Sequence, residues 1–252
     1  MTVYFIGAGP GAPDLLTLRG AELLARCTVC LYAGSLVPQE MLDRCPAGAR
    51  LINTARMPLP EIVDELVGAH RDGLDVARLH SGDISLYSAF TEQARRLDAA
   101  GVPYEIVPGV PAFAAASAAL GRELTVPGVG QSLLITRVST LSTDMPAGED
   151  LASLARTGVT LALHLAAHRA QALTDDLVPH YGADCPVAVV AFASRADERI
   201  VRCRLADLPQ RLAAEGITKT AVIFVGKVLD VDAFEESYLY SARRLRPPGA
   251  SH

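Results

Sequence analysis

The chain contains no Trp, and aromatic residues make up only 5% of its 252 residues. Proteins that stack on single-stranded nucleic acid need aromatic platforms. A basic stripe is missing too, because no basic run is longer than RRLR at residues 243–246 and the formal net charge is −5. We therefore expect no nucleic-acid partner.

Signals for membranes and secretion are also lacking. The most uniformly apolar run, residues 111–120, is about half the length of a membrane span. Residues 1–5 have neither a basic n-region nor a small-residue cleavage site. Five cysteines, an odd number, form no disulfide framework. The sequence therefore predicts no membrane partner and a reducing, cytoplasmic location.

The composition is that of a folded protein with its own core. Hydrophobic residues make up 50% of the chain and charged residues 20%, which excludes a disordered chain. A chain of this size buries about 70% of its extended surface on folding, so no disulfide is needed for stability.

Short β-branched runs alternate with amphipathic stretches along the whole chain, which predicts an α/β fold. The expected strands are residues 3–7, 28–32, 49–53, 76–81, 104–107, 132–136, 160–164, 187–193, 199–204 and 221–226. Helices are expected to begin at Pro13 and near Pro60, and to run from Phe90 to a stop at Gly101 and from Pro111 to a stop at Gly121. Continuous apolar strands suit a sheet covered on both faces, whereas arginines alternating through residues 199–204 indicate mixed or antiparallel pairing in the second half.

A glycine- and proline-containing stretch, GRELTVPGVG at residues 121–130, is the expected linker. We therefore expect an N-terminal α/β domain at residues 1–120 and a C-terminal α/β domain with a mixed sheet at residues 121–242. Residues 243–252 are expected to form a loose tail.

Three turns that contain glycine follow three of the expected strands: GAGPG at residues 7–11, SGD at 81–83 and PGVP at 108–111. Such turns let backbone N–H groups approach a ligand closely. In open α/β sheets, ligands bind in the crevice outside the carboxyl ends of the strands. The coincidence of three turns predicts a ligand site, although the first turn lacks the glycine spacing and the later acid of a dinucleotide fingerprint.

Other chemical motifs are incomplete. Cys27 and Cys30 form a CxxC that enters a strand and has no second CxxC, so buried structural cysteines are expected. His164 and His168 have i, i+4 spacing, but Leu165 occupies the position that a zinc hydrolase fills with Glu. No serine lies in a G-x-S-x-G elbow. We predict no metal site.

Seven stretches together resemble the tetrapyrrole (corrin/porphyrin) methylases. They are VYFIGAGPGAPDLLTLRGAELL (3–24), LYAGSLVP (31–38), HSGDISLYSA (80–89), VPGVPAFAAASAALG (107–121), ITR (135–137), YGADCPVAVVAFASRADERIV (181–201) and GITKTAVIFVGKVL (216–229). The resemblance covers nearly the whole chain in the expected order. YAGSLVP, SGDISLYSA and NTARMPLPEI (53–62) are most similar to members that methylate C11 of precorrin-4 in cobalamin synthesis.

The resemblance implies two α/β domains, a homodimer, and S-adenosylmethionine bound in the cleft between the domains. It implies methyl transfer to C11 of precorrin-4, giving precorrin-5 and S-adenosylhomocysteine. The cofactor positions that carry over are Pro10, Ser81, Gly82, Asp83, Leu86, Pro111, Ala112, Leu165, Ala193, Thr220 and Ala221.

Two departures concern the reacting groups. Many porphyrinogen methylases have Tyr-Asp-x-Leu where this chain has YAGSL at residues 32–36, and the lysine of their Gly-Lys-Arg stretch is replaced near Ala55 and Arg56. These departures argue against a uroporphyrinogen methylase and leave no catalytic residue assigned.

A polycarboxylate substrate on a net acidic protein requires a local basic lining. The candidates beside the matched motifs are Arg56, Arg122, Arg137, Arg195 and Lys219. Three alternatives remain open at this point. They are methylation of cobalt-precorrin-4 in the anaerobic pathway, a dinucleotide-dependent oxidoreductase, and a ligand-binding α/β protein without catalysis.

Overall fold

The computed structural model describes residues 1–139 and 144–231, and contacts divide the chain into two compact units. Unit 1 contains Met1–Ala116 and Phe192–Glu198, and unit 2 contains Ser117–Ala191 and the chain from Arg199 onward. The sequence-based domain boundary at residues 120 and 121 stays a prediction, and the expected tail at 243–252 lies outside the described residues.

Unit 1 is built on a parallel five-stranded sheet with the order β3-β2-β4-β1-β5. Its strands are β1 (Val3–Gly7), β2 (Val29–Tyr32), β3 (Arg50–Asn53), β4 (Val76–His80) and β5 (Tyr104–Val107). Its helices are α1 (Leu18–Leu24), α2 (Gln39–Leu42), α3 (Leu59–Arg71) and α4 (Phe90–Ala100).

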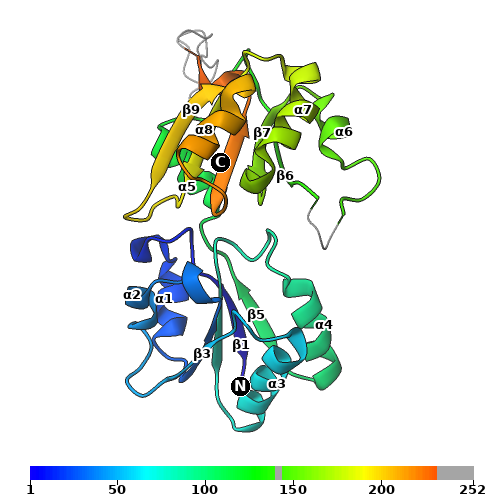
Figure 1. Ribbon diagram of the computed structural model, residues 1–252. Helices are drawn as coiled ribbons and strands as arrows, with labels where there is room; N and C mark the ends of the chain where they lie inside the picture. Colours follow the sequence, from blue (N-terminus) through cyan, green and yellow to red (C-terminus); the bar gives the residue numbers. More distant parts are fainter. Residues whose placement is uncertain (140–143, 232–252) are drawn as a thin grey trace, which may run out of the picture. The chain divides into compact units, whose positions relative to one another are not determined.

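Helices cover both faces of this sheet. Leu23 and Leu24 of α1 and Met41 of α2 join one apolar cluster, whereas Leu66 of α3 and Leu97 of α4 join the other. Figure 1 shows these two helix pairs on opposite sides of the strands. All five residues of β4 are buried, including the polar Arg78 and His80, which fits a parallel sheet covered on both faces.

Unit 2 has a mixed sheet with the order β6-β7-β10-β8-β9. Its strands are β6 (Leu133–Arg137), β7 (Thr160–His164), β8 (Pro186–Ala191), β9 (Arg199–Arg204) and β10 (Ala221–Val225). β6 and β7 are parallel, whereas β10 is antiparallel to β7 and β8, and β9 is antiparallel to β8. The prediction of mixed pairing in the second half is therefore confirmed.

The helices of this part of the chain are α5 (Ala112–Leu120), which spans the unit boundary, α6 (Leu151–Ala155), α7 (Ala170–Tyr181) and α8 (Leu208–Ala214). Short 3-10 turns occur at η1 (Pro13–Leu15), η2 (Gly34–Leu36), η3 (Ala167–Arg169), η4 (Leu205–Asp207) and η5 (Lys227–Leu229).

Every predicted strand is present, with ends that differ by at most two residues. The largest difference is at β8, which stops at Ala191 because Phe192 adopts a left-handed φ of 55°. The predicted helix start at Pro13 is wrong. Residues 13–15 form η1, and α1 begins at Leu18 because the Thr17 hydroxyl caps it by accepting from Gly20 N at 3.2 Å.

Candidate functional site

The three glycine-containing turns of unit 1 meet at the carboxyl edge of its sheet. β1 lies between β4 and β5, and all three strands are parallel, so their carboxyl ends are neighbours. The turns after β1 and β4 are joined by a pair of hydrogen bonds, Gly9 N to Gly82 O at 3.1 Å and Gly82 N to Gly9 O at 2.7 Å. The structure therefore brings together what the sequence predicted as one ligand crevice.

Close backbone approach explains two of these glycines. A Cβ atom on Gly7 would lie 2.6 Å from Gly109 N, and one on Gly109 would collide with the carbonyl oxygen of Gly82. Gly82 has a different reason, because its φ is +68° while the nearest atom to its Cβ position, Ala112 N, is 3.8 Å away. A Cβ atom on Gly82 would make ordinary van der Waals contact with this atom and, at 4.0 Å, with Pro111 Cα, so Gly82 faces the backbone of Pro111 and Ala112.

Asp83 braces this junction. Its Oδ2 accepts from Gly109 N at 2.7 Å, and its Oδ1 accepts from Ser85 N at 2.9 Å and from the Ser85 hydroxyl. Burial acts to raise the pKa of the Asp83 carboxyl, but these hydrogen bonds to the charged form outweigh it and lower the pKa. The ionised side chain therefore locks the loop after β4 to the loop after β5.

A loop from the second half of the sequence belongs to the same unit. Phe192–Glu198 connects β8 to β9, and the Ser194 hydroxyl accepts from Ala12 N at 3.0 Å. The Arg195 side chain lies so close to Gly11 that a Cβ atom there would collide with it. Ala193, a predicted cofactor position, is thus placed beside the glycine turn that contains Pro10. No periodicity or spacing in the sequence signals this contact.

The remaining predicted cofactor positions of the second half share one edge of the unit 2 sheet. Leu165 follows β7, and Ala221 begins β10, whose Ile223 pairs with Leu163. Because β7 and β10 are antiparallel, the end of β7 and the start of β10 lie at the same edge of the sheet. Leu165 and Thr220 both have a φ of 53°. Strained backbone of this kind in non-glycine residues clusters at functional sites.

The five predicted substrate-binding side chains do not form one group. Arg137 ends β6 beside His164, at the same sheet edge as Leu165, and Lys219 comes just before β10 at that edge. Arg122 instead donates to Val231 O at 3.3 Å, beyond the opposite end of β10.

The other two basic candidates lie in unit 1. Arg56 is exposed and follows β3. Arg195 forms an ion pair with Asp197 at 3.1 Å and its guanidinium lies 5.4 Å from the ring centre of Phe192. Both side chains are thus attached to loops at the carboxyl edge of the sheet or beside its glycine turn.

Sequence reasoning missed His80, which ends β4 directly before the SGD turn. The side chain is 6% exposed, and within the described part of the chain its Nε2 has no hydrogen-bond partner. Burial, with a smaller effect of Arg78, lowers the pKa of His80 to about 3, against a weaker opposing hydrogen bond to the Ser88 backbone. The imidazole is therefore neutral at physiological pH.

The CxxC pair is structural, as predicted. Cys27 and Cys30 are buried in the apolar cluster under α1 and α2, and burial raises the pKa of the Cys27 thiol to about 12. Among the described residues, no group of three or more His, Cys, Asp or Glu side chains is placed to hold a metal ion.

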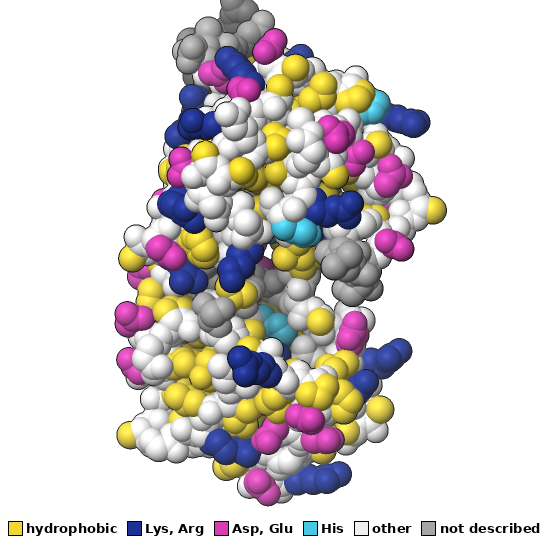
Figure 2. All heavy atoms as spheres, in the orientation of Figure 1, with side chains coloured by type: hydrophobic (Ala, Val, Ile, Leu, Met, Phe, Trp, Pro, Cys, Tyr) yellow, Lys and Arg dark blue, Asp and Glu magenta, His cyan; other side chains and the backbone are white. Residues whose placement is uncertain are grey.

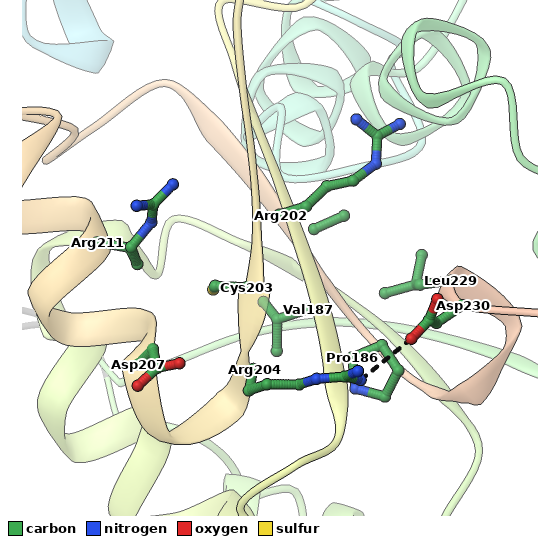
Figure 3. Close-up of a pocket in the computed structure, with 10 residues that line it drawn as sticks. Pro186, Val187, Arg202, Cys203, Arg204, Asp207, Arg211, Leu229 and Asp230 are labelled. Atoms are coloured by element: carbon green, nitrogen blue, oxygen red, sulfur yellow. Dashed lines mark hydrogen bonds and ion pairs between the residues drawn. The ribbon is translucent and has the colours of Figure 1, made fainter.

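A hollow of about 490 Å³ lies along β9 in unit 2 (Figure 3). Arg204 forms an ion pair there with Asp230 at 3.1 Å, and Arg202 donates to Leu120 O at 3.0 Å. None of the predicted cofactor or substrate positions lines this hollow. The ligand site predicted from the glycine-containing turns is therefore not this hollow.

The face drawn in Figure 2 carries charges of both signs, with basic and acidic side chains interspersed over it. Within residues 1–139 and 144–231, no helix combines the length and the apolar character that crossing a membrane requires.

Comparison with known proteins gives consistent results. The family profile of the Tetrapyrrole (Corrin/Porphyrin) Methylases matches residues 2–209. A precorrin-4 C(11)-methyltransferase of Rhodococcus erythropolis is 62% identical over 246 residues, which are 98% of this chain and 99% of the relative.

Two solved structures share the architecture. The cobalt precorrin-4 methyltransferase CbiF is 39% identical with a TM-score of 0.88, covering 91% of this chain and 96% of its own. A uroporphyrin-III C-methyltransferase of Thermus thermophilus, solved with S-adenosylhomocysteine, is 30% identical with a TM-score of 0.76. The match covers 94% of this chain and 97% of the other.

Proposed function

Because the chain belongs to the tetrapyrrole (corrin/porphyrin) methylase family, we propose that it methylates C11 of precorrin-4, giving precorrin-5 in cobalamin biosynthesis. The chain is an S-adenosylmethionine-dependent C-methyltransferase. The observation that carries the substrate assignment is the 62% identity with a precorrin-4 C(11)-methyltransferase over 98% of the chain.

The second candidate substrate is cobalt-precorrin-4. The TM-score of 0.88 with CbiF favours it, but the identity there is 39%, against 62% with the precorrin-4 enzyme. The metal-free ring is therefore the first substrate to test. Membership in a methylase family leaves the dinucleotide-dependent oxidoreductase and the non-catalytic binding protein without support.

The cofactor positions are proposed from the resemblance, and the local geometry supports them. Gly82, which carries no side chain and faces the backbone of Pro111 and Ala112, suits a ligand that meets main-chain atoms directly. Pro10, Ser81, Asp83, Leu86, Leu165, Ala193, Thr220 and Ala221 complete the proposed set. When bound, S-adenosylmethionine supplies an electrophilic methyl group on its sulfonium and leaves as S-adenosylhomocysteine.

The protein's part in the reaction is positioning. An enamine carbon of the tetrapyrrole is the nucleophile, so in-line orientation at near-contact distance can supply much of the rate acceleration. Arg56, Arg137, Arg195 and Lys219 are the proposed partners of the substrate's acetate and propionate groups, whereas Arg122, which bonds Val231 O beyond the opposite end of β10, is not retained. No general base is assigned, since Ala33 and Gly34 occupy the position of the acid in related methylases.

The assembly and location are proposals as well. We expect two α/β domains with the active site between them, a homodimer, and a cytoplasmic enzyme that binds neither nucleic acid nor membrane. The resemblance supports the first two, and the composition supports the others.

Product analysis tests the function. Precorrin-4 and S-adenosylmethionine are incubated with the protein, and the product is examined by mass spectrometry and by NMR at C11. One added methyl group at C11 is expected. A parallel reaction with cobalt-precorrin-4 decides between the two ring states. Methylation at another carbon would overturn the substrate assignment while leaving the family intact, and NADP binding in calorimetry would revive the oxidoreductase.

A further inference from the structure

Arg78 is a buried cation in the middle of β4. It is 4% exposed, and its register partners in the sheet are Phe5 of β1 and Leu31 of β2. Burial lowers its pKa to about 10, so the guanidinium stays charged at neutral pH. In the described part of the chain no carboxylate forms an ion pair with it. A buried charge without a counter-ion is unfavourable for stability, which calls for another reason for its presence.

Two chains of hydrogen bonds, called relays below, start at Arg78. The first relay leads to the loops after β2 and β3. Its Nη1 donates to Thr54 Oγ1 at 3.0 Å, and that hydroxyl donates to Tyr32 O at 3.1 Å. A guanidinium can only donate and a carbonyl can only accept, so the direction of both bonds is fixed. Tyr32 ends β2 and Thr54 follows β3, so the relay anchors residues 33–38 and the loop that carries Arg56.

The second relay leads to the loop after β4. Arg78 Nε donates to Gln93 Oε1 at 3.1 Å, and Gln93 Nε2 donates to Ala89 O at 3.1 Å. Ala89 precedes α4, has a left-handed φ of 52°, and ends the loop that begins with Ser81–Asp83. One guanidinium thus fixes the Gln93 amide and the carbonyl of a strained residue. The two relays start from one side chain and end on backbone of different loops.

We propose that Arg78 is a positioning residue for the methyl transfer, holding the substrate-side loops through Thr54 and the cofactor-side loop through Gln93. This role rests on the proposed function, because that function assigns Arg56 to the tetrapyrrole and Ser81, Gly82, Asp83 to S-adenosylmethionine. A medium-sized apolar side chain would pack against Phe5 and Leu31 without desolvating a charge, so packing alone does not require an arginine.

Two near-isosteric variants separate the relays: Thr54→Val and Gln93→Met. Calorimetry gives the Kd of S-adenosylhomocysteine, and steady-state kinetics give KM and kcat for precorrin-4. Thr54→Val is expected to raise KM for precorrin-4 about fivefold and to leave the Kd unchanged, the scale of one lost hydrogen bond. Gln93→Met is expected to raise the Kd about fivefold and to change KM less.

Arg78→Met is expected to raise both the KM for precorrin-4 and the Kd of S-adenosylhomocysteine. Arg78→Lys keeps the charge but lacks the two-armed donor geometry, so it is expected to bring both constants only part of the way back to their wild-type values. Leu79→Val is the matched control, because Leu79 is buried on the same strand and belongs to the apolar cluster on the other face. It is expected to lower the melting temperature without changing KM or Kd.

The proposal is overturned if both relay variants leave KM and Kd at wild-type values, or if both change the two constants equally. It is also overturned if Leu79→Val gives the kinetic changes of Arg78→Met. These outcomes are read against a wild type that methylates precorrin-4. A wild type that leaves precorrin-4 unmethylated overturns the proposed function itself, and the role in transfer with it. If Arg78→Met does not fold, the two relay variants, which keep the cation, still decide the question.

Discussion

Gly82 and Gly101 share a backbone φ of +68°. Only Gly82 lies where the three glycine-containing turns meet, whereas Gly101 caps the end of α4. Alanine at either position therefore adds a similar left-handed strain, about 1–2 kcal/mol. We predict that Gly82→Ala lowers the affinity for S-adenosylhomocysteine at least tenfold, whereas Gly101→Ala leaves it unchanged, because only the first places a methyl group in the proposed cofactor space. Calorimetry on both variants, with urea denaturation to compare their stabilities, makes the test. Equal affinities in the two variants would remove Gly82 from the site.

His80 makes folding stability depend on pH. Its folded pKa of about 3 lies below the unfolded value of 6.5, so between these values the unfolded chain binds a proton that the native state does not. The free energy of unfolding therefore falls as pH decreases through this window, by about 2 kcal/mol between pH 7 and 5 from this residue.

The matched variant is His80→Gln, which retains a donor for the Ser88 backbone but cannot titrate. Denaturation at pH 7 and 5 should show a smaller loss of stability in this variant than in the wild type. Part of the loss should persist, because burial also lowers the pKa of His164. Identical pH dependence in the two proteins would show that His80 is not buried as a neutral group.

Removing any single ionisable group near the site should lower the turnover of precorrin-4 less than the loss of a general base would. If positioning carries the reaction, Asp83→Asn, Arg56→Ala, Arg137→Ala and Lys219→Ala should each reduce turnover of precorrin-4 by less than about 10²-fold. The arginine that contacts a propionate should instead raise KM, as loss of uniform binding does. A loss near 10⁴-fold in kcat with intact cofactor binding would reveal an acid–base residue that the present assignment lacks.

At the scale of secondary-structure elements, the start of α1 gives a direct test of local capping. Thr17 Oγ1 accepts from Gly20 N at 3.2 Å and donates to Pro108 O at 3.4 Å. Thr17→Ala should lower the free energy of unfolding by about 1 kcal/mol, because the first turn then loses its side-chain acceptor. Thr17→Ser keeps the hydroxyl and should cost only a few tenths of a kcal/mol. Urea denaturation distinguishes them, and equal stabilities would mean that the cap contributes nothing.

The strands could be predicted because their signal is local. β8 is buried on both faces and therefore appears as an unbroken apolar run, whereas β4 is equally buried but carries Arg78 and His80 among its apolar residues. The start of α1 was missed because Pro13 and Asp14 are good first-turn residues, and only the Thr17 contact with Gly20 selects the later start.

Long-range contacts explain what the sequence could not provide in the candidate site. The three glycine turns were found because each follows its own strand. The contact of Ser194 with Ala12 joins residues 182 positions apart, and Arg78, Thr54 and Gln93 meet only through the tertiary fold. No periodic pattern encodes either arrangement, so such contacts appear only when the strand order is known.

At the scale of the whole molecule, we predict a homodimer whose contact does not use the β9 edge. β9 pairs only with β8 in the described sheet and carries Arg199, Arg202 and Arg204, and basic side chains on an edge strand oppose pairing with a second copy. Light scattering should give twice the 26.6 kDa of one chain. Ile200→Glu, at a residue of β9 that is 37% exposed, should leave that mass unchanged. A wild-type mass near 26.6 kDa would exclude the dimer, whereas dissociation of Ile200→Glu alone would place the interface on β9.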